Sequence, residues 1–228
     1  DSDSDANPEP AAGQDEIPFR LALLRAPGVG PVRFAGLLEN FGSARSLFDT
    51  GPGAWTDAGF TPETCAYLRN PDWKSVDTDL AWLSGPANHL LACDEAGYPA
   101  LLQEIADPPA LLFVHGDPDY LRQPQLAIVG SRNPTHAGVA LAREFAAYLS
   151  GFGLTISSGL ATGIDAAAHE GALEARGGTL AVTGTGLDRV YPACHRDLAH
   201  RIADNGALVS EFPPGTPPQA SNFPRRNR

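Results

Sequence analysis

The chain has 228 residues, 43% of them hydrophobic, which is enough for one large domain with a real core and a smaller second domain. It contains no run near the ~20 apolar residues of a membrane span, and no charged-then-apolar N-terminal segment typical of a secretory signal. The three cysteines are widely spaced and form no CxxC pair. This pattern argues against a disulfide framework or a zinc site and favours a reducing, cytoplasmic location.

The net charge of −11 is concentrated in the first half of the chain. Residues 1–118 hold 6 basic and 18 acidic groups, whereas residues 119–228 hold 10 arginines and 9 acidic groups. Six of the acidic residues lie in 1–16, a polar stretch that we expect to be a disordered tail. Local fields decide where a polyanion docks, so the second half of the chain stays open to nucleic acid.

Residues 17–83 are predicted to form a small all-helical domain. Helices are expected from Ile17 to Leu24, from Val32 to Phe41, from a Ser43 cap to Phe48, and from Thr61-Pro62 to Leu68. Gly-containing turns at 27–31 and 57–60 make the segment resemble a helix-hairpin-helix or SAM-like module, in which backbone amides can face a phosphate. The acidic balance of the segment favours the alternative, a helical bundle whose glycines only make the turns.

Residues 84–228 are predicted to form an α/β domain. Short apolar strands are expected at 89–93, 110–115, 126–130, 154–157, 179–183 and 207–210, and helices at 137–150, 163–175 and 196–204. Apolar strands that alternate with crossover helices indicate a mostly parallel, doubly wound sheet, and the strand at 126–130 is expected to be buried. The chain has no methionine and ends on a basic run, so we expect a piece of a longer protein, with this domain incomplete at its C-terminus.

Gly-rich and Ser/Thr-rich loops follow four of these strands, at 130–135, 158–165, 184–188 and 211–215. The carboxyl ends of parallel strands lie at one edge of a sheet, where open α/β folds bind ligands. Glycines allow close backbone approach, and helix N-termini present free N–H groups to anions. Four such loops in register predict a phosphate-facing rim, and Arg132 is its strongest candidate because its guanidinium can close over a phosphate.

Other polar groups near these loops suggest less. Asp165 and His169 lie four residues apart on one helix face, but no Ser or Cys nucleophile accompanies them, so we interpret both as organisers of the loop. His195 and Arg196 could reach a phosphate, and Tyr191 could stack on a base. The terminal segment combines an aromatic residue with arginines, which suits single-stranded nucleic acid; the candidates there are Phe223, Arg225 and Arg226.

Several long motifs in order carry a family resemblance: AIVGSRNPT, ISSGLATGIDAAAHEGALEA, GGTLAVTGTGLDRVYP, LVSEFPPGTPP and NFPRRNR. Over residues 88–228 they resemble the DNA-processing protein A (DprA/Smf) family of natural transformation. The resemblance implies an extended Rossmann-like domain that dimerises, protects and binds single-stranded DNA and loads the RecA recombinase. It also implies no catalysis and no cofactor, with the helical module as the family's N-terminal domain.

Carried over by motif, the resemblance assigns a phosphate pocket to three loops of this chain. Its residues are Gly130, Ser131 and Arg132 in the first loop, Ser158, Gly159 and Gly163 in the second, and Gly184 and Gly186 in the third. Family members often carry a basic residue directly after Tyr-Pro, where this chain has Ala193. His195 or Arg196 is therefore expected to replace that contact.

Two other classes of function stay open at this point. A nucleotide phosphoribohydrolase of the LOG type has a similar outline, but its PGGxGT-type loop is replaced here by Gly184-Thr185-Gly186. A pure interaction protein, with a recombinase as its main partner and incidental DNA contact, is the other. Release of free base from a nucleoside monophosphate would identify the first class, and the absence of saturable oligonucleotide binding would identify the second.

Overall fold

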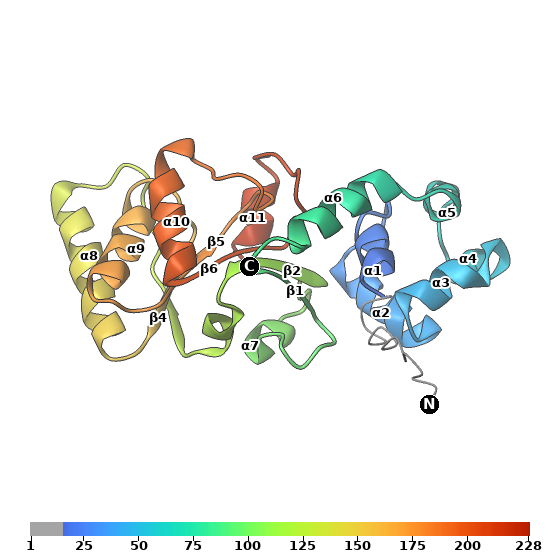
Figure 1. Cartoon of the computed structure of the whole chain (residues 1–228), viewed down its shortest axis with the longest axis horizontal. Helices are drawn as coiled ribbons and strands as arrows, with labels where there is room; N and C mark the ends of the chain where they lie inside the picture. Colours follow the sequence, from blue (N-terminus) through green and yellow to red (C-terminus); the bar gives the residue numbers. More distant parts are fainter. Residues whose placement is uncertain (1–15) are drawn as a thin grey trace, which may run out of the picture. The chain divides into compact units, whose positions relative to one another are not determined.

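The computed structural model describes residues 16–228, so the predicted tail at 1–16 lies outside the described residues except for Glu16. The chain divides into two compact units, Asp1–Leu80 and Ala81–Arg228 (Figure 1). Among the helices of the described part, none is long and apolar enough to cross a membrane.

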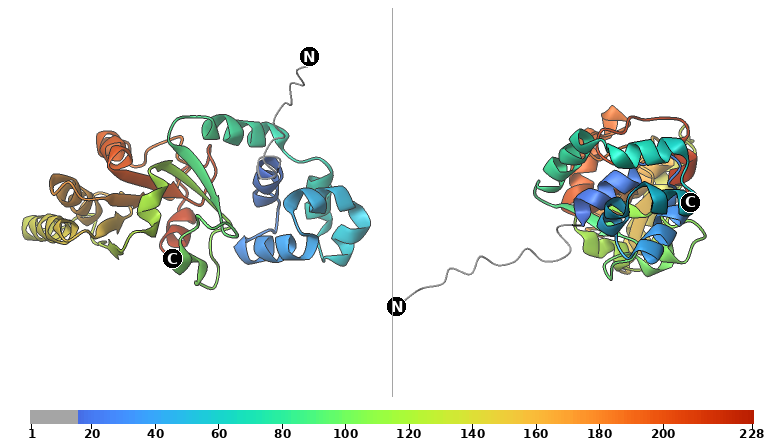
Figure 2. Two further views of the ribbon diagram at one scale, coloured as in Figure 1. Left: turned by 60° about the horizontal axis from the view of Figure 1, so that its bottom comes forward. Right: turned by 90° about the vertical axis from the view of Figure 1, so that its right-hand side faces the viewer.

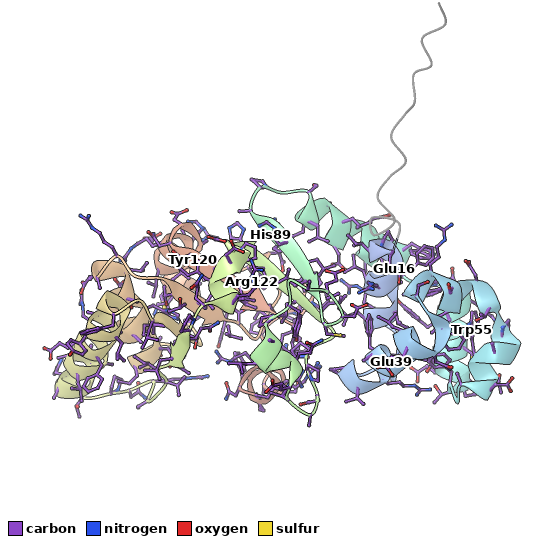
Figure 3. The ribbon with its side chains drawn as sticks, turned by 90° about the horizontal axis from the view of Figure 1, so that it is seen from below. Glu16, Glu39, Trp55, His89, Tyr120 and Arg122 are labelled. Carbon is purple, nitrogen blue, oxygen red and sulfur yellow. The ribbon has the colours of Figure 1, made fainter. Side chains whose placement is uncertain are left out.

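The first unit consists of short helices. They are α1 (Ile17–Leu24), α2 (Pro31–Phe41), α3 (Ala44–Thr50), α4 (Pro52–Asp57), α5 (Pro62–Arg69) and α6 (Trp73–Leu83), which runs across the boundary between the units. Ser43 and Thr61 cap α3 and α5 by accepting hydrogen bonds from backbone amides three residues later. The Glu16 carboxylate, labelled in Figure 3, also accepts from the first amides of α3. Helices α4 and α6 were not predicted individually.

Two hairpins of this unit hold each other in place. Gly28 and Gly59 occupy equivalent positions in the turns before α2 and α5, and both have a φ of +73°. Thr64 at the start of α5 donates to the carbonyl of Pro27 at 2.8 Å. Arg33 at the start of α2 donates to the carbonyl of Gly59, also at 2.8 Å. Each helix start therefore satisfies a backbone carbonyl of the opposite hairpin.

The second unit alternates strands and helices. Its strands are β1 (Asn88–Ala92), β2 (Leu111–Gly116), β3 (Gln125–Ala127), β4 (Thr155–Ser158), β5 (Thr179–Val182) and β6 (Gly206–Ser210). Its helices are α7 (Ala100–Gln103), α8 (His136–Gly151), α9 (Ile164–Glu174), α10 (Arg196–Asp204) and α11 (Asn222–Arg226), with 3₁₀ turns η1 (Pro118–Arg122) and η2 (Ala193–His195).

The strands form one six-stranded sheet in the order β1-β2-β6-β5-β4-β3. Strands β3 to β6 run parallel to one another, β2 pairs antiparallel with β6, and β1 pairs antiparallel with β2. This architecture confirms the predicted fold class, a mostly parallel α/β sheet together with a small helical domain. The carboxyl ends of β3, β4, β5 and β6 consequently lie at one edge of the sheet.

Alternate residues of the central strands face two separate cores. Ala181 and Leu208 pack under α9 and α10, and Ile156 packs under α8 and α9. Helices α8 and α9 lie side by side in Figure 1 and in the left view of Figure 2. Leu180 and Val209 point to the opposite face. There the segments around α7 and η1 cover the sheet, and Figure 3 labels Tyr120 and Arg122 in η1. Helical segments therefore cover both faces.

The first strand of the parallel set differs from its prediction. The apolar run at 126–130 was expected to be a buried strand, whereas β3 ends at Ala127 and all three of its residues are exposed. The physical reason is its place at the edge of the sheet, beside β4 alone. No helix was predicted in the basic run at the C-terminus, whereas Asn222–Arg226 form α11.

Candidate nucleic-acid interface

A cavity of about 580 Å³ opens at the carboxyl ends of β3, β4 and β5. It is bordered by the first two Gly-rich loops and by the end of α11. Its lining includes four of the predicted phosphate residues, Gly130, Arg132, Ser158 and Gly159. Asp165, Arg226, Asn227 and Arg228 complete its polar lining. The sequence predicted a rim of four loops; the loops after β3 and β4 meet in the cavity, whereas no residue of 184–188 or 211–215 belongs to its lining.

Arg132 leaves the first loop as an exposed cation. No carboxylate among residues 16–228 forms an ion pair with it, and its guanidinium carbon lies 5.8 Å from the centre of the Phe223 ring. A cation over an aromatic face keeps its N–H groups free at the edge. The guanidinium is therefore available to an anion in the cavity.

Asp165 organises the second loop. Its Oδ2 accepts from the amides of Gly159 at 3.1 Å and Ala161 at 3.3 Å. The interpretation of Asp165 as an organiser of this loop is confirmed. The same bonds mean that the Gly159 amide, expected to face a phosphate, already has a partner. The Ser158 hydroxyl also donates within the protein, to the carbonyl of Ile128 at 2.6 Å.

Two glycines of these loops allow the loops to contact each other. A side chain at Gly163, whose φ is +85°, would collide with the backbone of Ser131 and Arg132. A side chain at Gly130 would meet Ile164, its Cγ1 at 2.8 Å. The Ser131 carbonyl accepts from the Ile164 amide. These glycines therefore let the first loop lie against the start of α9, which sets the position of Arg132.

The rings of Phe223 and Tyr191 form an aromatic wall beside Gly184 of the third loop. An added Cβ at Gly184 would lie 3.0 Å from Cδ1 of Phe223, so the ring rests on this glycine. The rings of Phe223 and Tyr191 are 5.8 Å apart between centroids, and Tyr191 is 45% exposed. The predicted stacking residues Tyr191 and Phe223 are thus brought together beside Arg132.

Six predicted phosphate contacts lie outside the cavity lining: Ser131, Gly163 and Gly184, which are described above, and Gly186, His195 and Arg196. Gly186 packs against Pro213 and Asp188, away from the first two loops. His195 donates through Nδ1 to the carbonyl of Leu160 at 2.8 Å, which fixes the second loop. Arg196 is exposed at the first position of α10. The structure does not bring these residues to the cavity beside Arg132.

The arginines of the terminal segment divide into two kinds. Arg225 pairs with Glu211 at 2.8 Å, and Arg228 pairs with Glu211 at 2.7 Å and with Asp107 at 2.8 Å. Arg226 instead turns inward and donates through Nη1 to the carbonyl of Val182 at 2.7 Å. Burial lowers the pKa of Arg226; Asp165 raises it, and the charge of Arg132 lowers it again. Arg226 is the lining residue whose role sequence reasoning did not single out within its basic run.

His169 serves the sheet and not the cavity. It is fully buried, and its Nδ1 lies 2.7 Å from the hydroxyl of Thr179, which itself donates to the carbonyl of Ile156. The hydroxyl proton is thereby used, so Nδ1 is the donor and Nε2 is an acceptor; among the described groups Nε2 finds no partner. Burial, with a smaller contribution from His195, lowers the pKa of His169 to about 3.

Comparison with known proteins agrees with this geometry. The family model of DNA recombination-mediator protein A matches residues 89–228, and the DprA-like N-terminal HHH domain matches residues 14–67. Protein Smf of Synechocystis is 45% identical over 221 residues, which cover 93% of this chain and 55% of that protein. The chain spans about half the length of the curated relatives that it matches.

Solved structures share the fold. DNA processing protein A from Streptococcus pneumoniae superposes with a TM-score of 0.77 at 30% identity, over 92% of this chain and 72% of that one. DNA processing protein A from Helicobacter pylori, whose structure concerns its single-stranded DNA binding mode, gives a TM-score of 0.56 at 32% identity, over 61% and 62% of the two chains. The chain belongs to the DNA recombination-mediator protein A family, also named DprA or Smf.

Proposed function

We propose that this chain holds single-stranded DNA through its phosphates in the cavity at the carboxyl ends of β3, β4 and β5. The observation that carries the proposal is the pair of cations in that cavity, Arg132 and Arg226, which face it without a carboxylate partner of their own among residues 16–228. Unpaired guanidinium groups at a partly desolvated site are suited to phosphate.

The aromatic wall supports a preference for single strands. Bases of single-stranded DNA are free to stack, and Tyr191 with Phe223 offers rings next to the proposed phosphate site. Stacking contributes roughly 1–3 kcal/mol per base and tolerates any sequence. We therefore expect sequence-tolerant binding that prefers single-stranded over double-stranded DNA. The predicted contacts of His195 and Arg196 remain secondary in this proposal.

A non-catalytic role fits the two groups that could have done acid–base chemistry. The carboxylate of Asp165 is buried and occupied by two loop amides, and His169 is buried on the sheet with a strongly lowered pKa. His169 does not line the cavity, and the Asp165 carboxylate, which does, already accepts from two loop amides. We propose that the protein binds DNA without cleaving it and needs no cofactor.

The wider role follows from the family and is part of the proposal. We propose that the protein acts in the cytoplasm during natural transformation, where it protects incoming single strands and loads RecA. The three free thiols support a reducing compartment. We also propose a homodimer through the α/β unit. An exposed apolar stripe, formed by Leu141, Phe145 and Tyr148 of α8 and by Phe152 directly after it, supports a protein contact on this unit.

The test of the proposed function is fluorescence anisotropy of a labelled oligo-thymidine titrated with the protein at several salt concentrations. The proposal predicts saturable binding that weakens as salt rises, with a log–log slope of about −0.7 for each phosphate contacted. An unlabelled duplex of equal length is expected to compete poorly. Affinity that does not change with salt, or equal competition by the duplex, would contradict the proposal.

A further inference from the structure

The guanidinium of Arg226 fills the space that a side chain at position 159 would need. The three heavy atoms nearest to an added Cβ all belong to the Arg226 guanidinium, with Cζ at 2.6 Å and Nη2 at 2.8 Å. Gly159 does not have a positive φ, so its backbone conformation would accept alanine. The space above Gly159 is therefore occupied by an arginine and is not left open for a ligand.

The hydrogen bond of the Gly159 amide also argues against a direct contact between Gly159 and a phosphate. It donates to Oδ2 of Asp165, so it is not a free donor for a phosphate. The remaining role of Gly159 is to leave room for the Arg226 guanidinium beside the second loop. In that position Nη1 of Arg226 reaches the carbonyl of Val182, at the end of β5.

Arg226 has donors left over in this position. Its Nε is buried and finds no hydrogen-bond partner among the described residues. A buried donor without a partner costs free energy, more so on a charged group, unless a ligand satisfies it. The charges of Arg226 and Arg132 act on each other across the cavity that both side chains line. Two like charges in a partly desolvated site are stabilised by an anion between them.

From this geometry we propose that Arg132 and Arg226 clamp one phosphodiester group, and that Gly159 is the seat that places Arg226 for this contact. The proposal rests on the proposed function, and it names the second cation of the phosphate site. In this proposal Arg226, in the terminal segment, makes the phosphate contact that was expected from His195 or Arg196. Gly159 acts as a positioning residue, and Arg226 contacts the ligand.

The test is a double-mutant cycle on oligo-thymidine affinity with Arg226→Ala, Gly159→Ala and the double variant. Arg226→Ala is expected to weaken binding about tenfold, as loss of a charge-assisted hydrogen bond does. Gly159→Ala is expected to have a similar effect because the new methyl group displaces the guanidinium. In the Arg226→Ala background the same methyl group should leave the oligo-thymidine affinity unchanged, because no guanidinium remains to be displaced.

The outcomes separate the possible failures. Additive effects of the two substitutions would overturn the role of Gly159 as a seat, and unchanged affinity in Arg226→Ala would overturn the clamp. If the wild-type chain bound no oligonucleotide at all, the proposed function itself would fail. Arg201→Ala, which removes an exposed arginine paired with Glu170 on α9, is the matched control and should bind as the wild type does. Thermal melting of each variant checks that the fold is kept.

Discussion

Two arginines in each unit differ in whether their guanidinium groups are bound within the protein's own fold. In the helical unit Arg25 binds the buried carboxylate of Asp79, with Nη2 at 2.7 Å from Oδ1, and Arg33 donates to the carbonyl of Gly59 in the second hairpin. In the α/β unit Arg132 and Arg226 border a cavity without a carboxylate partner among the described residues. Arg25 and Arg33 hold the fold of the first unit, whereas Arg132 and Arg226 line a cavity of the second without an ion pair of their own among residues 16–228.

Glycine-rich turns do not make this distinction. Both units have glycines at their turns, and Gly28 and Gly59 even share a φ of +73°. In the α/β unit Gly130, Gly159 and Gly163 each let another part of the protein approach closely. Gly-rich turns by themselves therefore do not identify the proposed site, whereas the cavity that Arg132 and Arg226 both line does.

The largest effect that sharpens this comparison is expected from Asp79→Ala in the helical unit. The substitution leaves the mostly buried cation of Arg25 without its bidentate partner. Loss of one member of a buried ion pair costs about 3–5 kcal/mol of unfolding free energy. Urea denaturation followed by tryptophan fluorescence measures it, since Trp55 and Trp73 report on this unit.

Asp77→Ala is the matched control, because Asp77 lies in the same helix and is exposed. It should change the free energy of unfolding by no more than about 0.5 kcal/mol. Oligonucleotide affinity should be the same in both variants under conditions where they are folded. A clear loss of affinity in Asp77→Ala would show that the helical unit also contributes to DNA binding, and would break the comparison.

A smaller effect is expected from the buried histidine of the α/β unit. The pKa of His169 is lowered to about 3 in the fold, whereas an unfolded chain titrates near its ordinary value of 6.5. The unfolded state therefore binds the extra proton between these values. The contribution of His169 to the free energy of unfolding is fully present above pH 6.5. As the pH decreases from 6.5 toward 3, this contribution decreases by up to about 1.4 kcal/mol per pH unit.

Urea denaturation between pH 7 and pH 5 in wild type and His169→Gln measures this contribution. The variant should lose less stability over that range than the wild type, because glutamine does not titrate. His136→Gln, at an exposed histidine, should retain the wild-type dependence. Equal pH dependence in wild type and His169→Gln would mean that His169 is not held neutral by burial.

The sequence predicted the fold wherever local pattern and caps agree. The helix at 196–204 begins and ends as predicted, and the Ser43 and Thr61 caps lie where helices α3 and α5 start. The run at 126–130 was misjudged because an apolar pattern does not say whether a strand lies at the centre or at the edge of its sheet. Strand order is a tertiary property that one sequence does not state.

The candidate site was predicted in part for a similar reason. Motif order placed Gly130, Arg132, Ser158 and Gly159 at one edge, and the structure brings them to one cavity. Three arginines in the final segment looked equivalent in sequence. Only the helical turn of α11 and the carboxylates of Glu211 and Asp107 decide that Arg226 turns inward while Arg225 and Arg228 are neutralised.

The most direct test of the unpaired-arginine account is the oligo-thymidine affinity of Arg132→Ala, measured by anisotropy over a salt series beside the control Arg143→Ala, whose arginine pairs with Glu174. We expect a loss of about tenfold for Arg132→Ala with every oligonucleotide sequence, a salt slope shallower by about 0.7, and no change for Arg143→Ala. Wild-type affinity and slope in Arg132→Ala would contradict it.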